Sequence, residues 1–188
     1  MKLRETPLAG VMIVEPAVFA DERGWFMESF NAPRFEAALA ERGLPPAGPF
    51  VQDNHSSSRR GVLRGLHYQV PPHAQGKLVR VVHGRAFDVA VDIRRGSPSF
   101  GRWFGLELSE ANRCQLWIPP GFAHGFLALE DDTEFLYKTT DVYAKDCERS
   151  LRWDDPQLAI EWPAMPAAPV LAEKDGSAPL LSMQPDLF

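Results

Sequence analysis

The sequence lacks the features that mark several large classes of protein. Its 188 residues include two cysteines, Cys114 and Cys147, which are far apart and in no CxxC spacing, so we expect neither a disulfide nor a zinc site. No run of five or more Lys and Arg occurs, and a net charge of -5 gives no basic field for a nucleic-acid backbone. No apolar stretch is long enough to span a membrane, and residues 1–10 mix both charge signs, unlike a secretory signal. These absences predict a cytoplasmic protein that binds neither nucleic acid nor membrane.

The composition and the strand pattern predict an all-β domain. With 45% hydrophobic and 24% charged residues, we expect residues 1–188 to form one compact domain. Its core spans about residues 50–145, where short alternating apolar segments are separated by Gly, Pro, Ser and Asp. In residues 86–96, Phe87, Val89 and Val91 share one face of a strand and Asp88 lies on the other. Many short strands with regular turns favour a sandwich or barrel, and the length suits a jelly roll.

The segments outside this core are predicted to be an N-terminal part with strands and a helix, and a C-terminal tail. Asn31 can cap the start of the helix, Pro33 suits its first turn, Phe35 and Leu39 share one face, and Gly43 ends it. From Trp162 onward the chain contains five prolines, so we expect an irregular tail that wraps the surface.

Reactive side chains gather in two segments of the predicted core. In residues 53–80, Arg64 and His67 flank Gly65 near the start of a strand, and Lys77 falls on the next strand. In residues 115–143, His124 follows a Pro-Gly corner, and Tyr137 shares a strand face with Phe135 and Thr139. Taken singly, each has an ordinary structural interpretation, such as a hydrogen-bonded histidine or a packing tyrosine. Together in a small barrel they indicate a site, because buried ionisable groups are costly without a partner or a task.

Histidines in a β-barrel also raise the possibility of a metal site. The segment PPGFAHG resembles the second motif of the cupin superfamily, and the region around His67 occupies the place of the first. Metal-binding cupins have HxH followed by Glu there, whereas this chain has Gln69 two residues after His67 and no acid before Asp88. His73 lies in a Pro-rich loop, so His67 and His124 fall short of the three protein ligands typical of a catalytic ion. We expect no metal, and a metal-dependent cupin remains the alternative.

Eight blocks occur in order along nearly the whole chain: FADERGWFMESFN, FVQDNHSSS, VLRGLHYQ, AQGKLVR, FDVAVDIRRGSPSFG, LWIPPGFAHGFL, FLYKTTDVY and AEKDGSAPLL. Their order and spacing resemble the dTDP-4-dehydrorhamnose 3,5-epimerase family. This resemblance implies a cupin-type jelly roll that forms a homodimer. It also implies an isomerase that acts on dTDP-4-dehydro-6-deoxy-D-glucose without metal or coenzyme. The expected pathway is the biosynthesis of dTDP-L-rhamnose or a related deoxysugar.

The resemblance also assigns roles to individual residues. It places the base on His67, its partner acid on Asp175 and the catalytic tyrosine on Tyr137, and it stacks Tyr143 on the thymine. The implied contacts to the sugar nucleotide are Arg23, Glu28, Gln52, Asp53, Asn54, Arg64, Lys77, His124, Glu148 and Lys174. The chain departs from the family at Val142, where an aromatic residue is frequent, and in the length of the Pro-rich segment before Lys174.

These residue types suit an epimerisation beside a ketone. A C4 ketone acidifies the protons on C3 and C5, so His67 can act as a base near neutral pH and Lys77 can stabilise the enolate charge. Inversion needs a proton on the opposite face, for which Tyr137 is the candidate acid. Arg23 and Arg64 match the oxygens of a diphosphate. An epimerase acting on C3 or C5 alone, and a non-catalytic sugar-nucleotide binder, remain alternatives on the same framework.

Overall fold

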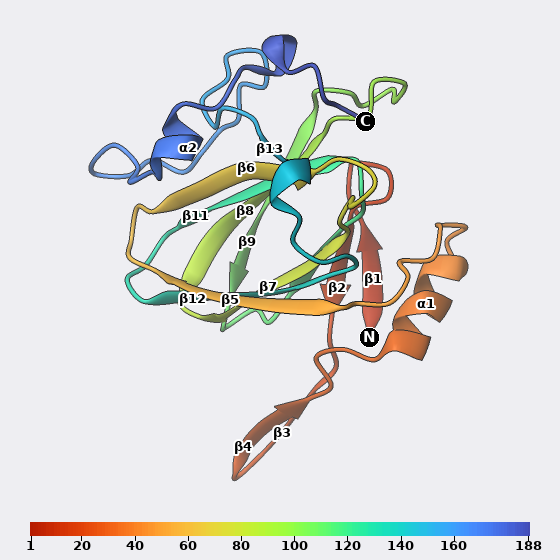
Figure 1. The fold of residues 1–188 in the computed structure, drawn as a ribbon. Helices are drawn as coiled ribbons and strands as arrows, with labels where there is room; N and C mark the ends of the chain where they lie inside the picture. Colours follow the sequence, from red (N-terminus) through yellow and green to blue (C-terminus); the bar gives the residue numbers. More distant parts are fainter.

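The computed structural model describes residues 1–188 as two facing antiparallel sheets with a projecting hairpin and an irregular C-terminal tail (Figure 1). The first sheet has the order β1 (Lys2–Glu5), β2 (Met12–Glu15), β10 (Gln115–Ile118), β7 (Lys77–His83), β12 (Thr133–Thr139) and β5 (Gln52–Ser58). The second has the order β13 (Glu148–Ser150), β6 (Leu63–Gln69), β11 (Phe122–Ala128), β8 (Arg85–Asp92) and β9 (Trp103–Ser109). Apart from β1–β2 and β8–β9, neighbouring strands in each sheet are not consecutive in sequence, as in a jelly roll, so the predicted all-β sandwich is confirmed.

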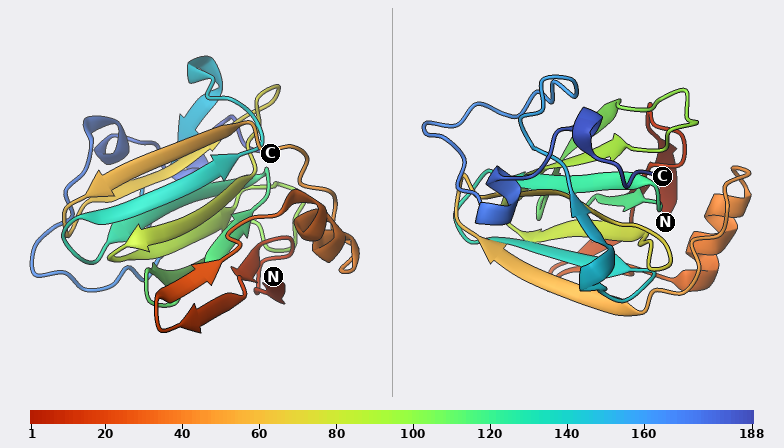
Figure 2. Two further views of the ribbon diagram at one scale, coloured as in Figure 1. Left: turned by 90° about the horizontal axis from the view of Figure 1, so that it is seen from below. Right: turned by 45° about the horizontal axis from the view of Figure 1, so that its top comes forward.

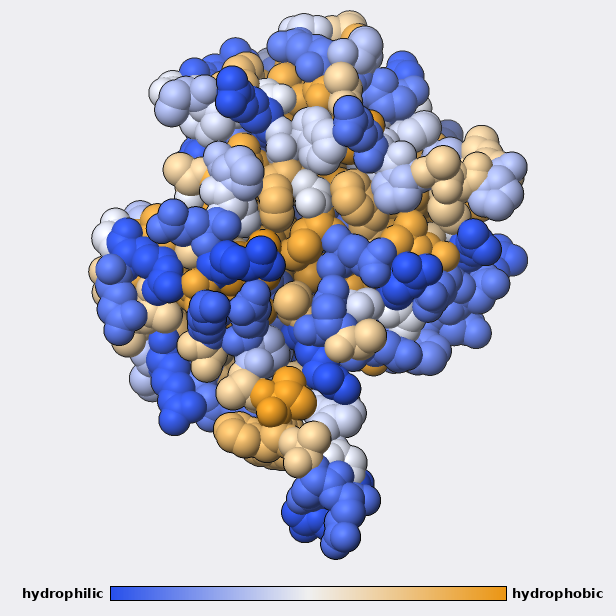
Figure 3. Space-filling view, turned by 180° about the vertical axis from the view of Figure 1, so that it is seen from behind, coloured by the Kyte–Doolittle hydropathy of each residue, from blue (hydrophilic) through white to orange (hydrophobic).

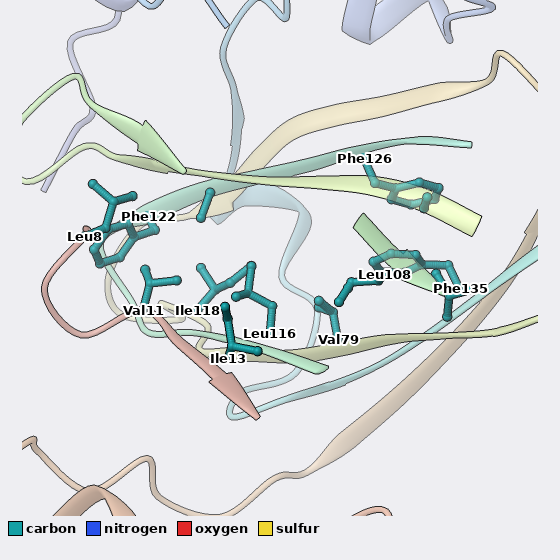
Figure 4. Close-up of a cluster of buried hydrophobic side chains, with 13 residues drawn as sticks. Leu8, Val11, Ile13, Val79, Leu108, Leu116, Ile118, Phe122, Phe126 and Phe135 are labelled. Atoms are coloured by element: carbon teal, nitrogen blue, oxygen red, sulfur yellow. The ribbon is translucent and has the colours of Figure 1, made fainter. Parts of the chain in front are cut away.

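The main core lies between the two sheets. It contains apolar side chains from both inner faces, among them Val79, Leu108 and Leu116, and it runs from Leu8 at one end to Phe135 at the other (Figure 4). At the Phe135 end, Phe126 and Phe135 stack with ring centroids 4.1 Å apart. This end of the core adjoins the hollow described below.

The C-terminal tail covers the outer face of the second sheet (Figures 1 and 2). Val89 and Val91 of β8 face outward and pack with Leu158 and Leu181 of the tail, while Asp88 lies on the opposite, inward side of the strand. The tail is irregular apart from short helical turns, α2 (Glu173–Gly176) and two 3₁₀ turns, Lys145–Cys147 before it and Leu181–Met183 near its end. The apolar side chains that alternate along β8 are therefore buried beneath the tail and not between the two sheets.

Helix α1 (Ala32–Ala40) lies on the outer face of the first sheet. Its start is fixed by the Asn31 side chain, which accepts a hydrogen bond from the Arg34 amide, and Gly43 beyond its end has a φ of 67°. Phe35 and Leu39 are buried, and Phe35 meets Trp117 with ring centroids 5.5 Å apart. The helix predicted from its caps is confirmed.

The hairpin of β3 (Val18–Asp21) and β4 (Gly24–Met27) projects from the body of the molecule (Figures 1 and 3). It exposes 66% of Phe19, 54% of Trp25 and 70% of Phe26. A two-stranded ribbon with large exposed apolar side chains is marginal alone, which marks this hairpin as an interaction surface. No helix in the structure has the length and apolar character needed to cross a bilayer.

Candidate active site

A pocket of about 510 Å³ opens between the two sheets, beneath the start of the C-terminal tail. Its volume is in the range of small-ligand sites. Among the residues that line it are most of the predicted site residues: Asn54, Arg64, His67, Lys77, His124, Tyr137, Tyr143, Glu148, Lys174 and Asp175. Strands from both sheets and α2 thus bring together side chains that are distant in sequence, such as His67 and Asp175, which are 108 residues apart.

His67 and Asp175 form the closest polar pair of this pocket. His67 Nε2 lies 2.6 Å from Asp175 Oδ1, and the Gly65 amide donates to Asp175 Oδ2 at 3.3 Å. Burial of Asp175 acts to raise its pKa, but the hydrogen bond from His67 and the bond from Gly65 outweigh it, and the pKa is lowered. The ionised carboxylate fixes the His67 proton on Nε2 and leaves Nδ1 as the basic nitrogen.

Lys77 lies beside this pair as a buried cation. Its Nζ donates to the His67 carbonyl oxygen at 3.3 Å. Burial lowers the Lys77 pKa to about 8, while the charges of Asp88 and Glu148 oppose that effect. The ammonium is therefore still charged near neutral pH, in a setting with little competing water.

Tyr137 lies on the inner face of β12, packed beside Phe135 as the strand alternation predicts. Burial raises the pKa of Tyr137, and the Arg64 charge acts in the opposite direction. Its hydroxyl consequently stays protonated near neutral pH and can donate a proton.

Three polar side chains are linked at the mouth of the pocket. Tyr143 donates from its hydroxyl to Glu148 at 3.1 Å, and Lys174 Nζ donates to the other carboxylate oxygen of Glu148 at 2.9 Å. Lys174 precedes Asp175 in α2, so its ion pair with Glu148 holds α2 against β13 while Asp175 reaches His67. Tyr143 is 53% exposed, which leaves its ring available for a stacked base.

Four predicted contact residues do not line this pocket. Arg23 lies on the projecting hairpin and pairs with Asp21, and Glu28 accepts a hydrogen bond from Arg34. Asp53 pairs with Lys138 on the outer side of the first sheet. Gln52 lies at the margin, where it donates to Asn54 Oδ1 and accepts from the Tyr143 amide, both at 2.9 Å.

The structure adds one polar pair that the sequence analysis did not assign. His124 Nε2 lies 2.7 Å from Asp88 Oδ1, and Asp88 is fully buried. The sequence feature that could have indicated this pair is the carboxylate of Asp88 in the middle of a mostly apolar strand. His73, considered as a metal ligand, instead contacts Asp141 at 3.2 Å. No group of three or more His, Cys, Asp and Glu side chains has metal-ligand spacing, and the expectation of a metal-free site stays a prediction.

Comparison with known proteins identifies the family. The family model described as dTDP-4-dehydrorhamnose 3,5-epimerase matches residues 5–183. The enzyme of that name from Pseudomonas aeruginosa is 56% identical over 175 residues, 93% of each chain. A crystal structure of the Legionella pneumophila dTDP-6-deoxy-D-glucose-3,5-epimerase with dTDP-4-keto-L-rhamnose superposes with a TM-score of 0.90 at 50% identity, covering 97% of this chain and 93% of that one. A 3'-monoepimerase from Streptomyces bikiniensis, in complex with dTDP-quinovose, gives 0.84 at 35% identity, covering 95% and 88%. This chain, a cupin-type jelly roll, belongs to the dTDP-4-dehydrorhamnose 3,5-epimerase family.

Proposed function

We propose that this protein inverts C3 and C5 of dTDP-4-dehydro-6-deoxy-D-glucose to give dTDP-4-dehydro-L-rhamnose. The observation that carries the proposal is the His67–Asp175 pair in one pocket with Lys77 and Tyr137. The relatives named as 3,5-epimerases support it, as does the Legionella structure with a bound keto-rhamnose nucleotide. The reaction feeds the synthesis of dTDP-L-rhamnose or a related deoxysugar.

The proposed reaction is a proton removal followed by a proton return. His67 Nδ1 takes the proton from the carbon beside the ketone, and Asp175 stabilises the imidazolium that forms. The Lys77 ammonium holds the negative charge on the C4 oxygen of the enolate. Tyr137 then donates a proton to the carbon from the opposite face, which inverts it. Proton exchange with solvent removes the proton from His67 and reprotonates Tyr137, so that both are ready for the next cycle. Two such cycles, at C3 and at C5, complete the conversion without a redox step.

Incubation with the 4-keto sugar nucleotide in heavy water tests this proposal. We expect deuterium at both C3 and C5 of the product, and His67→Ala should lose both. Absence of exchange at either carbon would contradict the proposal. Full epimerisation by His67→Ala would instead favour another base.

A single-carbon epimerase is the second candidate, because the Streptomyces bikiniensis 3'-monoepimerase shares this fold at 35% identity. Both reactions use the same base and acid, so the catalytic residues alone do not discriminate. Product stereochemistry by NMR distinguishes them: inversion at both carbons supports the proposal, and inversion at C3 alone favours the alternative.

The predicted homodimer belongs to this proposal. Arg23, which the family resemblance assigns to the sugar nucleotide, lies on a hairpin that exposes Phe19 and Phe26 and does not line the pocket of its own chain. A second copy of the chain would cover these apolar side chains and could receive Arg23 in its own pocket. The cytoplasmic location expected from the sequence stays a prediction.

A further inference from the structure

Asp88 is a buried carboxylate that the proposed reaction does not use. It lies in the middle of β8 on the inward face and is fully buried. One oxygen, Oδ1, is 2.7 Å from His124 Nε2, whereas Oδ2 is one of two buried side-chain atoms in the structure without a hydrogen-bond partner. A buried carboxylate is costly unless positive charge or donors compensate it.

Lys77 is a buried cation in the same interior. The titratable or charged side chains that line the pocket with Lys77 include His55 on β5, Arg64 and His67 on β6, His124 on β11, Tyr137 on β12, Tyr143, Glu148 on β13, and Lys174 and Asp175 on α2. Asp88 on β8 lies behind His124, to which it is hydrogen-bonded. Among the charged groups that raise the Lys77 pKa, Asp88 has the largest effect, although burial lowers that pKa by more. No hydrogen bond or ion pair joins Asp88 to Lys77, so the Asp88 charge acts on Lys77 across the buried interior that both side chains occupy.

His124 lies in the same interior, and its Nε2 is hydrogen-bonded to Asp88. Nδ1 of His124 makes no hydrogen bond within the chain. It is not buried as Asp88 Oδ2 is, so part of this nitrogen is accessible to solvent. Because His124 lines the pocket, this accessible part faces the pocket. Burial lowers the His124 pKa, with Asp88 opposing, so the ring is neutral near neutral pH.

Given the proposed function, we infer that Asp88 is a positioning residue for both His124 and Lys77. Its carboxylate holds the His124 proton on Nε2, which leaves Nδ1 facing the pocket as a hydrogen-bond acceptor. Its negative charge keeps Lys77 as the cation that binds the C4 oxygen. The two groups then have separate tasks: His124 accepts a hydrogen bond from a sugar hydroxyl, and Lys77 donates to the enolate oxygen. An acceptor cannot stabilise an enolate oxygen, so His124 does not substitute for Lys77.

The test is the pH dependence of kcat/KM for Asp88→Asn, which removes the charge and keeps the shape. Lys77 must be protonated to act, so activity falls as pH rises through its pKa of about 8. Without the Asp88 charge we expect the alkaline limb to move to lower pH by about one unit, a tenfold change in the protonation equilibrium. An unmoved alkaline limb would overturn the proposed effect of Asp88 on Lys77.

Asp92→Asn is the matched control. Asp92 lies on the same face of β8 and is also fully buried, but it is ion-paired with Arg94 at 2.7 Å outside the pocket. We expect Asp92→Asn to lower stability and to leave the alkaline limb where it is. If Asp92→Asn shifts the alkaline limb of the pH profile as much as Asp88→Asn does, then removing any buried charge from β8 has this effect. That result would also overturn the inference.

A second measurement does not need a folded variant or an active enzyme. Nitrogen NMR of the His124 ring in the wild-type protein near neutral pH should show a neutral imidazole with its proton on Nε2. An imidazolium, or a proton on Nδ1, would overturn the assignment of His124. Because this readout is independent of turnover, it separates failure of this inference from failure of the proposed epimerisation, which the heavy-water experiment reports.

Discussion

At the scale of single residues, the hydrogen bond between Asp175 and His67 yields the first prediction. Asp175→Asn keeps the size of the side chain but removes the charge that fixes the His67 proton on Nε2 and stabilises the imidazolium. We expect kcat to fall about 10²–10⁴-fold, the contribution typical of a positioned general base. Steady-state kinetics with the keto-sugar nucleotide measure it.

Asp186→Asn is the control for this change. Asp186 also lies in the C-terminal tail, but its carboxylate makes a partly exposed ion pair with Arg149 at 2.7 Å, which contributes little. We expect its kcat to stay within about twofold of wild type. An equal loss in both variants would show that the tail tolerates no change, and would remove the support for a dyad.

The hydroxyl of Tyr137 yields the second prediction, which separates proton removal from inversion. Tyr137→Phe keeps the packing against Phe135 but removes the acid on the opposite face of the sugar. We expect deuterium exchange at the starting configuration to continue while inverted product falls at least about 10²-fold. NMR of the recovered sugar nucleotide measures both quantities.

Tyr68→Phe provides the comparison, because the Tyr68 hydroxyl donates to the Asp186 carbonyl at 2.8 Å rather than facing the reacting carbon. It should lose about 1 kcal/mol of stability and keep the wild-type ratio of inversion to exchange. If Tyr137→Phe keeps that ratio too, Tyr137 is not the acid.

At the scale of elements, the close pairing of β6 and β11 yields the third prediction. A Cβ added at Gly125 would lie 2.7 Å from the Arg64 carbonyl oxygen and 3.1 Å from Gly65 Cα, so the two strands approach closely because both residues are glycine. These strands carry His67 and His124 in register. We expect Gly125→Ala to force them apart and lower the free energy of unfolding by about 1–3 kcal/mol. Chemical denaturation measures this loss.

Gly96→Ala is the matched substitution, because a Cβ there meets no atom within 4 Å and the φ of Gly96 is not in the left-handed region. Its stability should change by less than about 0.5 kcal/mol. A loss at Gly96 as large as that at Gly125 would mean that steric contact between the strands is not the cause.

The regular elements were predictable to the extent that their determinants are local. Helix α1 follows from Asn31, Pro33 and Gly43, and the core strands follow from apolar alternation. Which face of β8 points into the molecule was not predictable from the strand alone. Its apolar face is covered by a tail segment that lies about seventy residues or more farther along the chain. Asp88 was therefore interpreted as the polar side of a strand, although that side faces the interior between the two sheets.

At the scale of the whole molecule, the sequence predicted the gathering of His67, Lys77 and Tyr137 because strand alternation sets which side chains point inward. It placed Asp175 there only by resemblance, since no local pattern encodes where an irregular tail returns. For Arg23 the missing information lies outside one chain: the hairpin carries it away from the pocket that it is predicted to serve.

The fourth prediction tests whether Arg23 acts across a dimer. If the hairpin of one chain completes the pocket of the other, a heterodimer of Arg23→Ala and His67→Ala chains has one pocket with both changes and one with neither. Purified through two different tags, it should therefore recover about half of the wild-type kcat/KM, although each homodimer is impaired. A heterodimer of Asp175→Asn and His67→Ala is the control: both residues lie in the same pocket of one chain, so each pocket keeps one defect and no recovery is expected. If the first heterodimer also shows no recovery, or if the wild-type chain runs as a monomer in gel filtration, Arg23 does not act in the pocket of a partner.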